Sequence, residues 1–123
     1  LSSNASSTQA PPPNTIFANT SVKAYVVSPT ASAWMTDGVY RNALASFNVD
    51  YVWKNGAGTY NVIMQTPMLD TQYVVIPSLR VGGVTHAHVM YLMVSAYQFR
   101  IFTVDSAGNA TDMMWNAVVI GAQ

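Results

Sequence analysis

The segment "SFNVDYVWKNGAGTYNVIMQT", residues 46–66, decides the fold that the sequence predicts. Its first part alternates large apolar residues with polar ones, so that in a strand the apolar set shares one face. That set is Phe47, Val49, Tyr51 and Trp53. A glycine-rich turn follows at 54–58, and residues 59–66 return with a second apolar set on one face. The segment therefore predicts an antiparallel hairpin with one buried, aromatic face.

Five other segments are rich in β-branched and aromatic residues and are bounded by turn residues, as strands are. They are residues 22–27, 72–79, 87–95, 97–105 and 113–121. No window combines a helical period with capping residues. We therefore expect an all-β fold, an antiparallel β-sandwich of about seven to eight strands. Pro77 cannot donate a ladder hydrogen bond, so its strand is expected at a sheet edge or a bulge. The aromatic residues expected in the core are Phe47, Tyr51, Trp53, Tyr60 and Phe99.

The first 21 residues have a different composition from the rest of the chain. They are small, polar and proline-rich, with three consecutive prolines at 11–13, and they show no periodicity. We expect residues 1–21 to form an extended Ser/Pro-rich arm or linker, and residues 22–123 to form the β-sandwich domain. The arm suggests either that the chain belongs to a longer protein or that it joins a larger assembly.

The overall composition favours self-association. Half of the residues are apolar and 8% are charged, whereas about a quarter is usual for charged residues. A domain of 123 residues has too little interior for so many apolar side chains, so part of them is expected in subunit interfaces. Basic and acidic residues number five each, which argues against nucleic acid as a partner. No apolar run is long enough to insert into a membrane, and the absence of cysteine excludes disulfides and thiolate chemistry.

Several motifs occur in a characteristic order. "VKAYVV" (22–27) and "SFNV" (46–49) are followed by the turn "NGAG" (55–58) and by "YNV" (60–62). "TPMLDTQYVV" (66–75) and a closing "WNAVVIG" (115–121) complete the series. In this order the motifs resemble the C-terminal β-sandwich domain of bacteriophage tail fibres and tail-associated virion proteins. The resemblance covers residues 22–76 well and 99–121 loosely, whereas 28–44 and 78–97 depart from the pattern.

The resemblance implies a virion structural protein, the terminal domain of a tail fibre or related appendage that attaches the particle to its host by non-covalent receptor binding. Its expected partners are other virion proteins, copies of itself in a homotrimer, and a glycan or protein of the host surface. Two alternatives stay open. One is a capsid-decorating or fibre-joining module that recognises only virion proteins, and the other is a carbohydrate-binding domain of a bacterial enzyme.

The sequence offers no catalytic motif. Glutamate is absent, the five aspartates are scattered singly, and neither a nucleophile elbow nor a phosphate loop is present. We therefore expect a protein without enzymatic activity or a cofactor. The segment "DSAGNATD" (105–112) contains the oxygen ligands of a weak calcium loop, but without EF-hand spacing, and a plain connecting turn is the preferred interpretation.

Trp34 and Tyr40, with their neighbours Asp37 and Arg41, are the candidate receptor-binding residues. They lie in the long turn-rich segment 28–44, and an aromatic plate beside hydrogen-bonding side chains suits a sugar. The simpler alternative is that Trp34 only closes the end of the sandwich.

His86 and His88 are the candidate metal ligands, because strand positions i and i+2 share a face. Two imidazoles are too few for one chain to hold an ion. Three chains around an axis would supply six, an octahedral shell for a transition metal that acid would weaken by protonating the ligands. The alternative, which we favour, is a pair of ordinary surface histidines.

Overall fold

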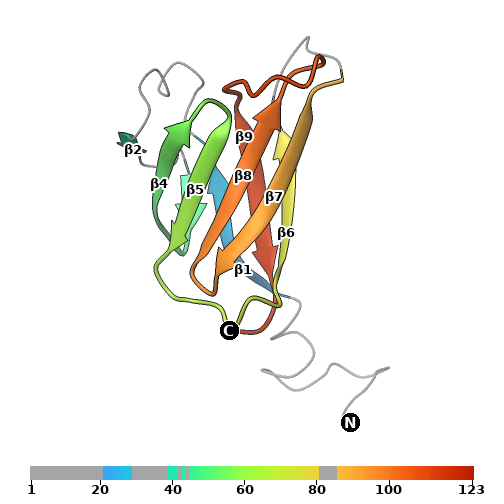
Figure 1. Ribbon diagram of the computed structural model, residues 1–123. Coiled ribbons are helices and arrows are strands. Elements are labelled where there is room, and N and C mark those ends of the chain that lie inside the picture. Colours follow the sequence, from blue (N-terminus) through green and yellow to red (C-terminus); the bar gives the residue numbers. More distant parts are fainter. Residues whose placement is uncertain (1–20, 29–38, 42, 44, 81–85) are drawn as a thin grey trace, which may run out of the picture.

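The computed structural model describes residues 21–28, 39–41, 43, 45–80 and 86–123, and in this part of the chain it contains nine strands in two antiparallel sheets (Figure 1). The strands are β1 (Val22–Val27), β2 (Val39–Arg41), β3 (Ala45–Phe47), β4 (Val49–Gly56), β5 (Thr59–Met64), β6 (Val74–Leu79), β7 (His88–Ser95), β8 (Gln98–Val104) and β9 (Trp115–Ile120). The four-stranded sheet has the order β3-β1-β9-β6, and the five-stranded sheet has the order β2-β4-β5-β8-β7. The expected antiparallel β-sandwich is confirmed. The described residues include no helix, and therefore none long and apolar enough to cross a membrane.

The core lies between the two sheets and follows the alternation of the strands. Its largest fully buried side chains are Trp115, Tyr60, Phe99 and Ile101. The ring centroids of Tyr60 and Trp115 are 5.5 Å apart at an interplanar angle of 49°, which is a favourable tilted aromatic contact. The expected core positions of Tyr60 and Phe99 are thus confirmed.

The other three aromatic residues expected in the core, Phe47, Tyr51 and Trp53, lie elsewhere, because the segment 46–53 is not one strand. Asn48 has a left-handed backbone with a φ of 57°, a conformation that asparagine tolerates well. It separates β3, which joins the four-stranded sheet, from β4, which joins the five-stranded sheet. The Asn48 side chain holds this crossing, because its amide donates to the carbonyls of Lys23 (3.1 Å) and Thr66 (3.0 Å).

A register shift between Val49 and Tyr51 then interrupts the alternation within β4, so that Val49 and Tyr51 no longer face the same side of the sheet. Val49 and Val52 face the core, whereas Tyr51 and Trp53 lie on the outer face of the five-stranded sheet, opposite Ile63 and Asn61. Phe47 is exposed on the other sheet. The prediction that Phe47, Tyr51 and Trp53 are core residues was therefore wrong. A period of two holds only within an uninterrupted strand.

Two edge strands lie side by side on one flank of the sandwich. β6 pairs only with β9, and β7 pairs only with β8, and the two edges are adjacent in space (Figure 1). The prediction from Pro77 is confirmed, because β6 is an edge strand. Tyr73 ties this flank together at one end: its hydroxyl donates to the carbonyls of Ser95 (2.9 Å) and Gln98 (3.0 Å). Burial raises the pKa of Tyr73 to about 12.

Candidate functional site

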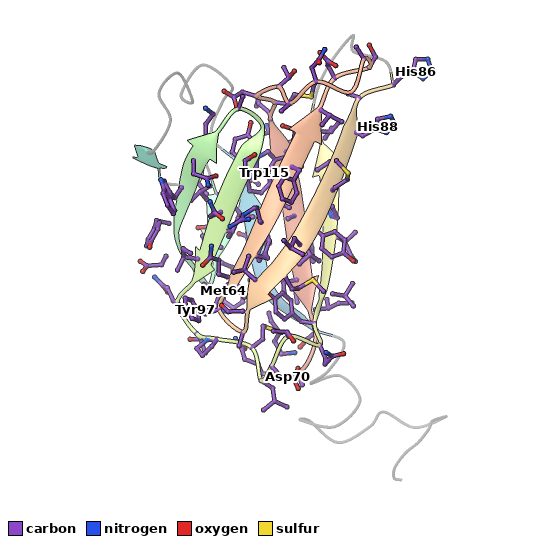
Figure 2. All side chains as sticks on the ribbon, in the orientation of Figure 1. Met64, Asp70, His86, His88, Tyr97 and Trp115 are labelled. Atoms are coloured by element: carbon purple, nitrogen blue, oxygen red, sulfur yellow. The ribbon has the colours of Figure 1, made fainter. Side chains whose placement is uncertain are left out.

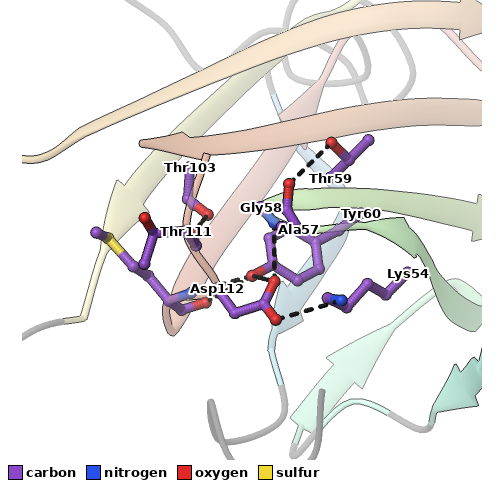
Figure 3. A network of polar contacts seen from close by, with 9 residues as sticks. Lys54, Ala57, Gly58, Thr59, Tyr60, Thr103, Thr111 and Asp112 are labelled. Carbon is purple, nitrogen blue, oxygen red and sulfur yellow. Dashed lines mark hydrogen bonds and ion pairs between the residues drawn. The ribbon is translucent and has the colours of Figure 1, made fainter. Parts of the chain in front are cut away.

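An ion pair between a buried lysine and a half-buried aspartate closes one end of the sandwich (Figure 3). Lys54 points inward from β4 and is only 2% exposed, and its Nζ lies 3.3 Å from Oδ2 of Asp112. The other carboxylate oxygen, Oδ1, accepts hydrogen bonds from the backbone N–H of Gly58 (2.8 Å) and the hydroxyl of Tyr60 (3.1 Å). The Tyr60 hydroxyl in turn accepts from the backbone N–H of Met113 at 3.0 Å. Burial raises the pKa of Tyr60 well above its usual range, so the phenol stays neutral.

The partners of this cluster identify its role. Both carboxylate oxygens of Asp112 are engaged by groups of the same chain, and they join β4, the β4–β5 turn and the approach to β9. A lysine is almost never fully buried unless it is paired in this way. We therefore interpret the Lys54–Asp112 pair as a structural connection and not as a reactive site.

The segment 105–112 is a connecting turn held by its own aspartate. Oδ1 of Asp105 accepts the backbone N–H groups of Ala107 and Asn109, each at 2.9 Å. The hydrogen bond from the backbone of Asn109 is the main reason why the pKa of Asp105 is lowered. An aspartate whose oxygen caps its own loop is the usual arrangement of an Asx turn. This geometry agrees with the connecting turn that the sequence favoured over a calcium loop.

The candidate receptor residues fall only partly within the described structure. Trp34 and Asp37 lie outside the described residues. Tyr40 and Arg41 belong to β2, where their backbones pair with Trp53 and Val52 of β4. The structure thus places the strand that carries two of the four predicted residues at the edge of the five-stranded sheet, next to Trp53.

A polar and aromatic row crosses the outer face of that sheet beside β2. The register aligns Trp53 with Asn61, and Asn61 with Arg100. Asn61 is fully buried although it faces outward, because its neighbours cover it. Its Oδ1 accepts from Nε of Arg100 (2.8 Å) and from Nε2 of Gln98 (3.1 Å), and its Nδ2 donates to the carbonyl of Trp53 (3.3 Å). We call Trp53, Asn61, Gln98 and Arg100 the polar row.

The polar row can recognise a ligand without performing chemistry on it. Within the described residues Arg100 forms no ion pair. Of the five N–H donors of its guanidinium only the one on Nε donates to Asn61, so the other four are directed to other groups or to solvent. A guanidinium fixed in this way suits a carboxylate or vicinal hydroxyl groups. Sequence reasoning missed this row because it placed Trp53 in the core. The signal was present in Asn61 and Arg100, polar residues at the outward parity of predicted strands.

The two histidines lie at the same end of the molecule, both exposed to solvent (Figure 2). β7 begins at His88, which pairs with Val104, whereas His86 precedes the strand with a left-handed φ of 61°. The expectation that both share one strand face was therefore wrong. Among the described residues no group of three or more His, Asp or Glu side chains could hold a metal ion. A site shared between chains stays a prediction.

Comparisons of the chain with family models, with curated proteins and with solved structures give no match.

Proposed function

We propose that this chain is a virion structural protein, the terminal domain of a phage tail fibre or related appendage, and that it attaches the particle to the host surface by non-covalent binding. The motifs behind the resemblance coincide with the residues that hold the sandwich together. Gly58 and Tyr60 belong to the β4–β5 hairpin and contact Asp112, and Tyr73 ties the loop before β6 to the β7–β8 turn. A framework built on those residues supports membership of that class of domain.

The polar row is the observation that carries the binding proposal. Hydrogen bonds from Arg100 and Gln98 to Asn61 already fix the two side chains, so a ligand that binds them loses less free energy to side-chain ordering. Trp53 lies in the same row, and the backbone of β2, the strand that contains Tyr40 and Arg41, pairs with β4. An aromatic residue two strands away from a fixed guanidinium suits the apolar face and the hydroxyl or carboxylate groups of a surface sugar. We therefore place the receptor site on the outer face of the five-stranded sheet, with a host-surface glycan as the ligand class.

The same proposal includes other virion proteins and further copies of the chain as partners. A homotrimer is the expected form, located in the tail or another surface appendage of the virion. The chain supplies recognition and not catalysis.

The test is binding of the fluorescently labelled full chain to a panel of bacterial strains. For the strain that binds it, the variant Arg100→Ala is expected to weaken binding at least about tenfold, which corresponds to roughly 1.4 kcal/mol. Asn61 keeps Gln98 as a donor in that variant, so the fold should persist. Lys23→Ala is the matched control, because it removes a positive charge from the opposite sheet.

Competition with purified surface polysaccharide identifies the ligand class. Polysaccharide that releases the wild-type chain supports the glycan receptor. Undiminished binding of Arg100→Ala would place the receptor site elsewhere. If the chain bound no strain and captured only virion proteins, it would be a fibre-joining or capsid-decorating module. A catalytic domain in the parent reading frame would instead favour the carbohydrate-binding domain of an enzyme.

A further inference from the structure

The outer face of the four-stranded sheet is apolar where an exposed face is normally polar. An antiparallel sheet with one solvated face alternates apolar residues inward with polar residues outward. In β6 and β9, however, both parities are apolar near one end of the sheet: Val75 and Val119 face the core, whereas Ile76 and Val118 face outward. This sheet has the pattern of one that is covered on both sides.

The strand register shows that the outward apolar residues are continuous across the sheet. One cross-strand row joins all four strands, and a second row lies next to it on three of them. The first row is Phe47, Tyr25, Val118 and Ile76, and the second is Val22, Ile120 and Val74. We call these seven residues the apolar face. In the first row the rings of Tyr25 and Phe47 stack with centroids 6.3 Å apart.

The size of this face matches one subunit interface. Five of its members, Val22, Tyr25, Phe47, Val74 and Ile76, are between 40% and 54% exposed, and the other two are half-buried. With roughly 150–250 Å² per fully exposed large side chain, the face presents on the order of 500 Å² of apolar surface. A standard interface covers about 800 Å² on each partner, of which rather more than half is non-polar. The face therefore supplies the apolar part of one such interface.

The charge of the face indicates which partner covers it. Its strands carry a single charged residue, Lys23, which lies at a register shift and donates to Ser21 Oγ at 2.8 Å. Because the face carries almost no charge, electrostatic attraction does not select an acidic or a basic partner for it. It can, however, meet a copy of itself without opposing like charges, as a symmetric assembly requires.

We infer that the apolar face is the self-association surface of this protein, and that copies of the chain pack it against one another. The inference deepens the proposed function, since a homotrimeric fibre needs such a surface, and it identifies the sheet that faces inward. The polar row on the other sheet would then point outward from the assembly.

Native mass and sedimentation of the full chain over a concentration series test this inference. The wild-type chain is expected to be larger than a monomer at micromolar concentration. Ile76→Lys, at the most exposed residue of the face, on its β6 edge, should raise the dissociation constant at least tenfold. Leu92→Lys is the matched control: Leu92 is 49% exposed against 54% for Ile76, but it lies on β7, in the other sheet.

Cross-linking gives a second readout that does not depend on a destabilising charge. Because the natural chain has no cysteine, a bifunctional maleimide should join copies of Ile76→Cys but not of Leu92→Cys. A wild-type chain that stays monomeric would overturn the inference, and so would dissociation by Leu92→Lys but not by Ile76→Lys. If deletion of residues 1–20 turned a monomer into an oligomer, the arm and not a second copy would cover the face. Host binding is scored separately, so an intact oligomer that binds no cell contradicts only the proposed receptor function.

Discussion

Replacement of Gly58 by alanine should destabilise this domain far more than replacement of Gly56 or Gly108. Gly58 has a φ of +62°, so an L-residue there adopts the left-handed conformation at a cost of about 1–2 kcal/mol. In addition, a Cβ at this position would lie 2.3 Å from the carbonyl oxygen of Thr103 and 2.8 Å from the backbone nitrogen of Thr111. These are backbone atoms, which cannot rotate away.

The contacts at risk set the size of the effect. The Gly58 carbonyl accepts from Thr103 N–H at 2.9 Å, the Gly58 N–H donates to Asp112 at 2.8 Å, and Thr111 N–H donates to the Thr103 carbonyl at 3.1 Å. A neutral hydrogen bond contributes about 1 kcal/mol, and one to a charged group about 1.5–3 kcal/mol. If the clash disrupts two of the three, the total with the backbone strain is about 3–6 kcal/mol. That is a large part of the 5–15 kcal/mol that separates a typical folded domain from its unfolded state.

Two other glycines separate the backbone strain from the clash. Gly108 also has a positive φ, +86°, but nothing lies within 4 Å of its added Cβ, so Gly108→Ala should cost only about 1–2 kcal/mol. Gly56 has neither a positive φ nor a neighbour within 4 Å, so Gly56→Ala should change the stability by less than about 0.5 kcal/mol.

Urea unfolding followed by tryptophan fluorescence measures all three variants, because Trp115 is buried against Tyr60 and reports the packing of the core. For a domain of this size 1 kcal/mol corresponds to roughly 4–8 °C in Tm, so the same ranking should appear in thermal melts. Equal destabilisation by Gly58→Ala and Gly108→Ala would refute the reasoning, since the close approach of the Thr103 and Thr111 backbones would then carry no cost.

Three further predictions concern charge and protonation. Asp112→Asn should destabilise the domain by up to about 3–5 kcal/mol in urea unfolding because it removes the carboxylate charge that lies 3.3 Å from the buried Lys54 ammonium, and Lys54→Met/Asp112→Asn should recover part of that loss. Burial raises the pKa of Tyr73 to about 12, so folding keeps this phenol protonated at pH values where the unfolded chain has lost the proton. The resulting contribution to the free energy of unfolding, at most roughly 2–3 kcal/mol, is complete below pH 10 and should be lost between pH 10 and 12. Tyr73→Phe should flatten that alkaline decline in stability, and an unchanged pH slope would contradict the assignment. If the chain assembles without metal, neither a chelator nor His86→Ala/His88→Ala should change Tm or oligomer mass. Stoichiometric metal in the purified protein would instead support a metal site shared by the histidines of several chains.

The parts of the fold that the sequence predicted are those fixed by local chemistry. The glycine-rich turn places the β4–β5 hairpin, Pro77 places β6 at an edge, and the alternation in 59–66 places Tyr60 in the core. The parity of Tyr51 and Trp53 could not be predicted, because it depends on a left-handed Asn48 and on a register shift that no residue pattern announces.

The candidate site was harder to predict than the fold because it depends on long-range register. Arg100 meets Asn61 only after β5 and β8 pair, although the two residues lie 39 positions apart in the chain. Lys54 lies on β4 and Asp112 in the loop before β9, so these two residues likewise meet only in the folded chain. From the sequence each of these residues appeared as an isolated polar position.

The surplus of apolar residues in the composition has a location in the structure. The inward positions of both sheets fill the core, and part of the surplus occupies the apolar face. The outer face of the other sheet carries Arg100, Gln98 and Asn61 beside the exposed apolar residues Met90 and Leu92 of β7. A single domain in solution gains nothing from an outer face of valine, isoleucine and stacked aromatic rings, whereas a domain that repeats around an axis needs one apolar side and one hydrated side. The two sheets of this sandwich differ in that the five-stranded sheet presents the guanidinium of Arg100 on its outer face, whereas the strands of the four-stranded sheet carry Lys23 as their one charged residue. For this reason the apolar face and the polar row are best tested together, with Ile76→Lys affecting assembly and Arg100→Ala affecting recognition, each without the other.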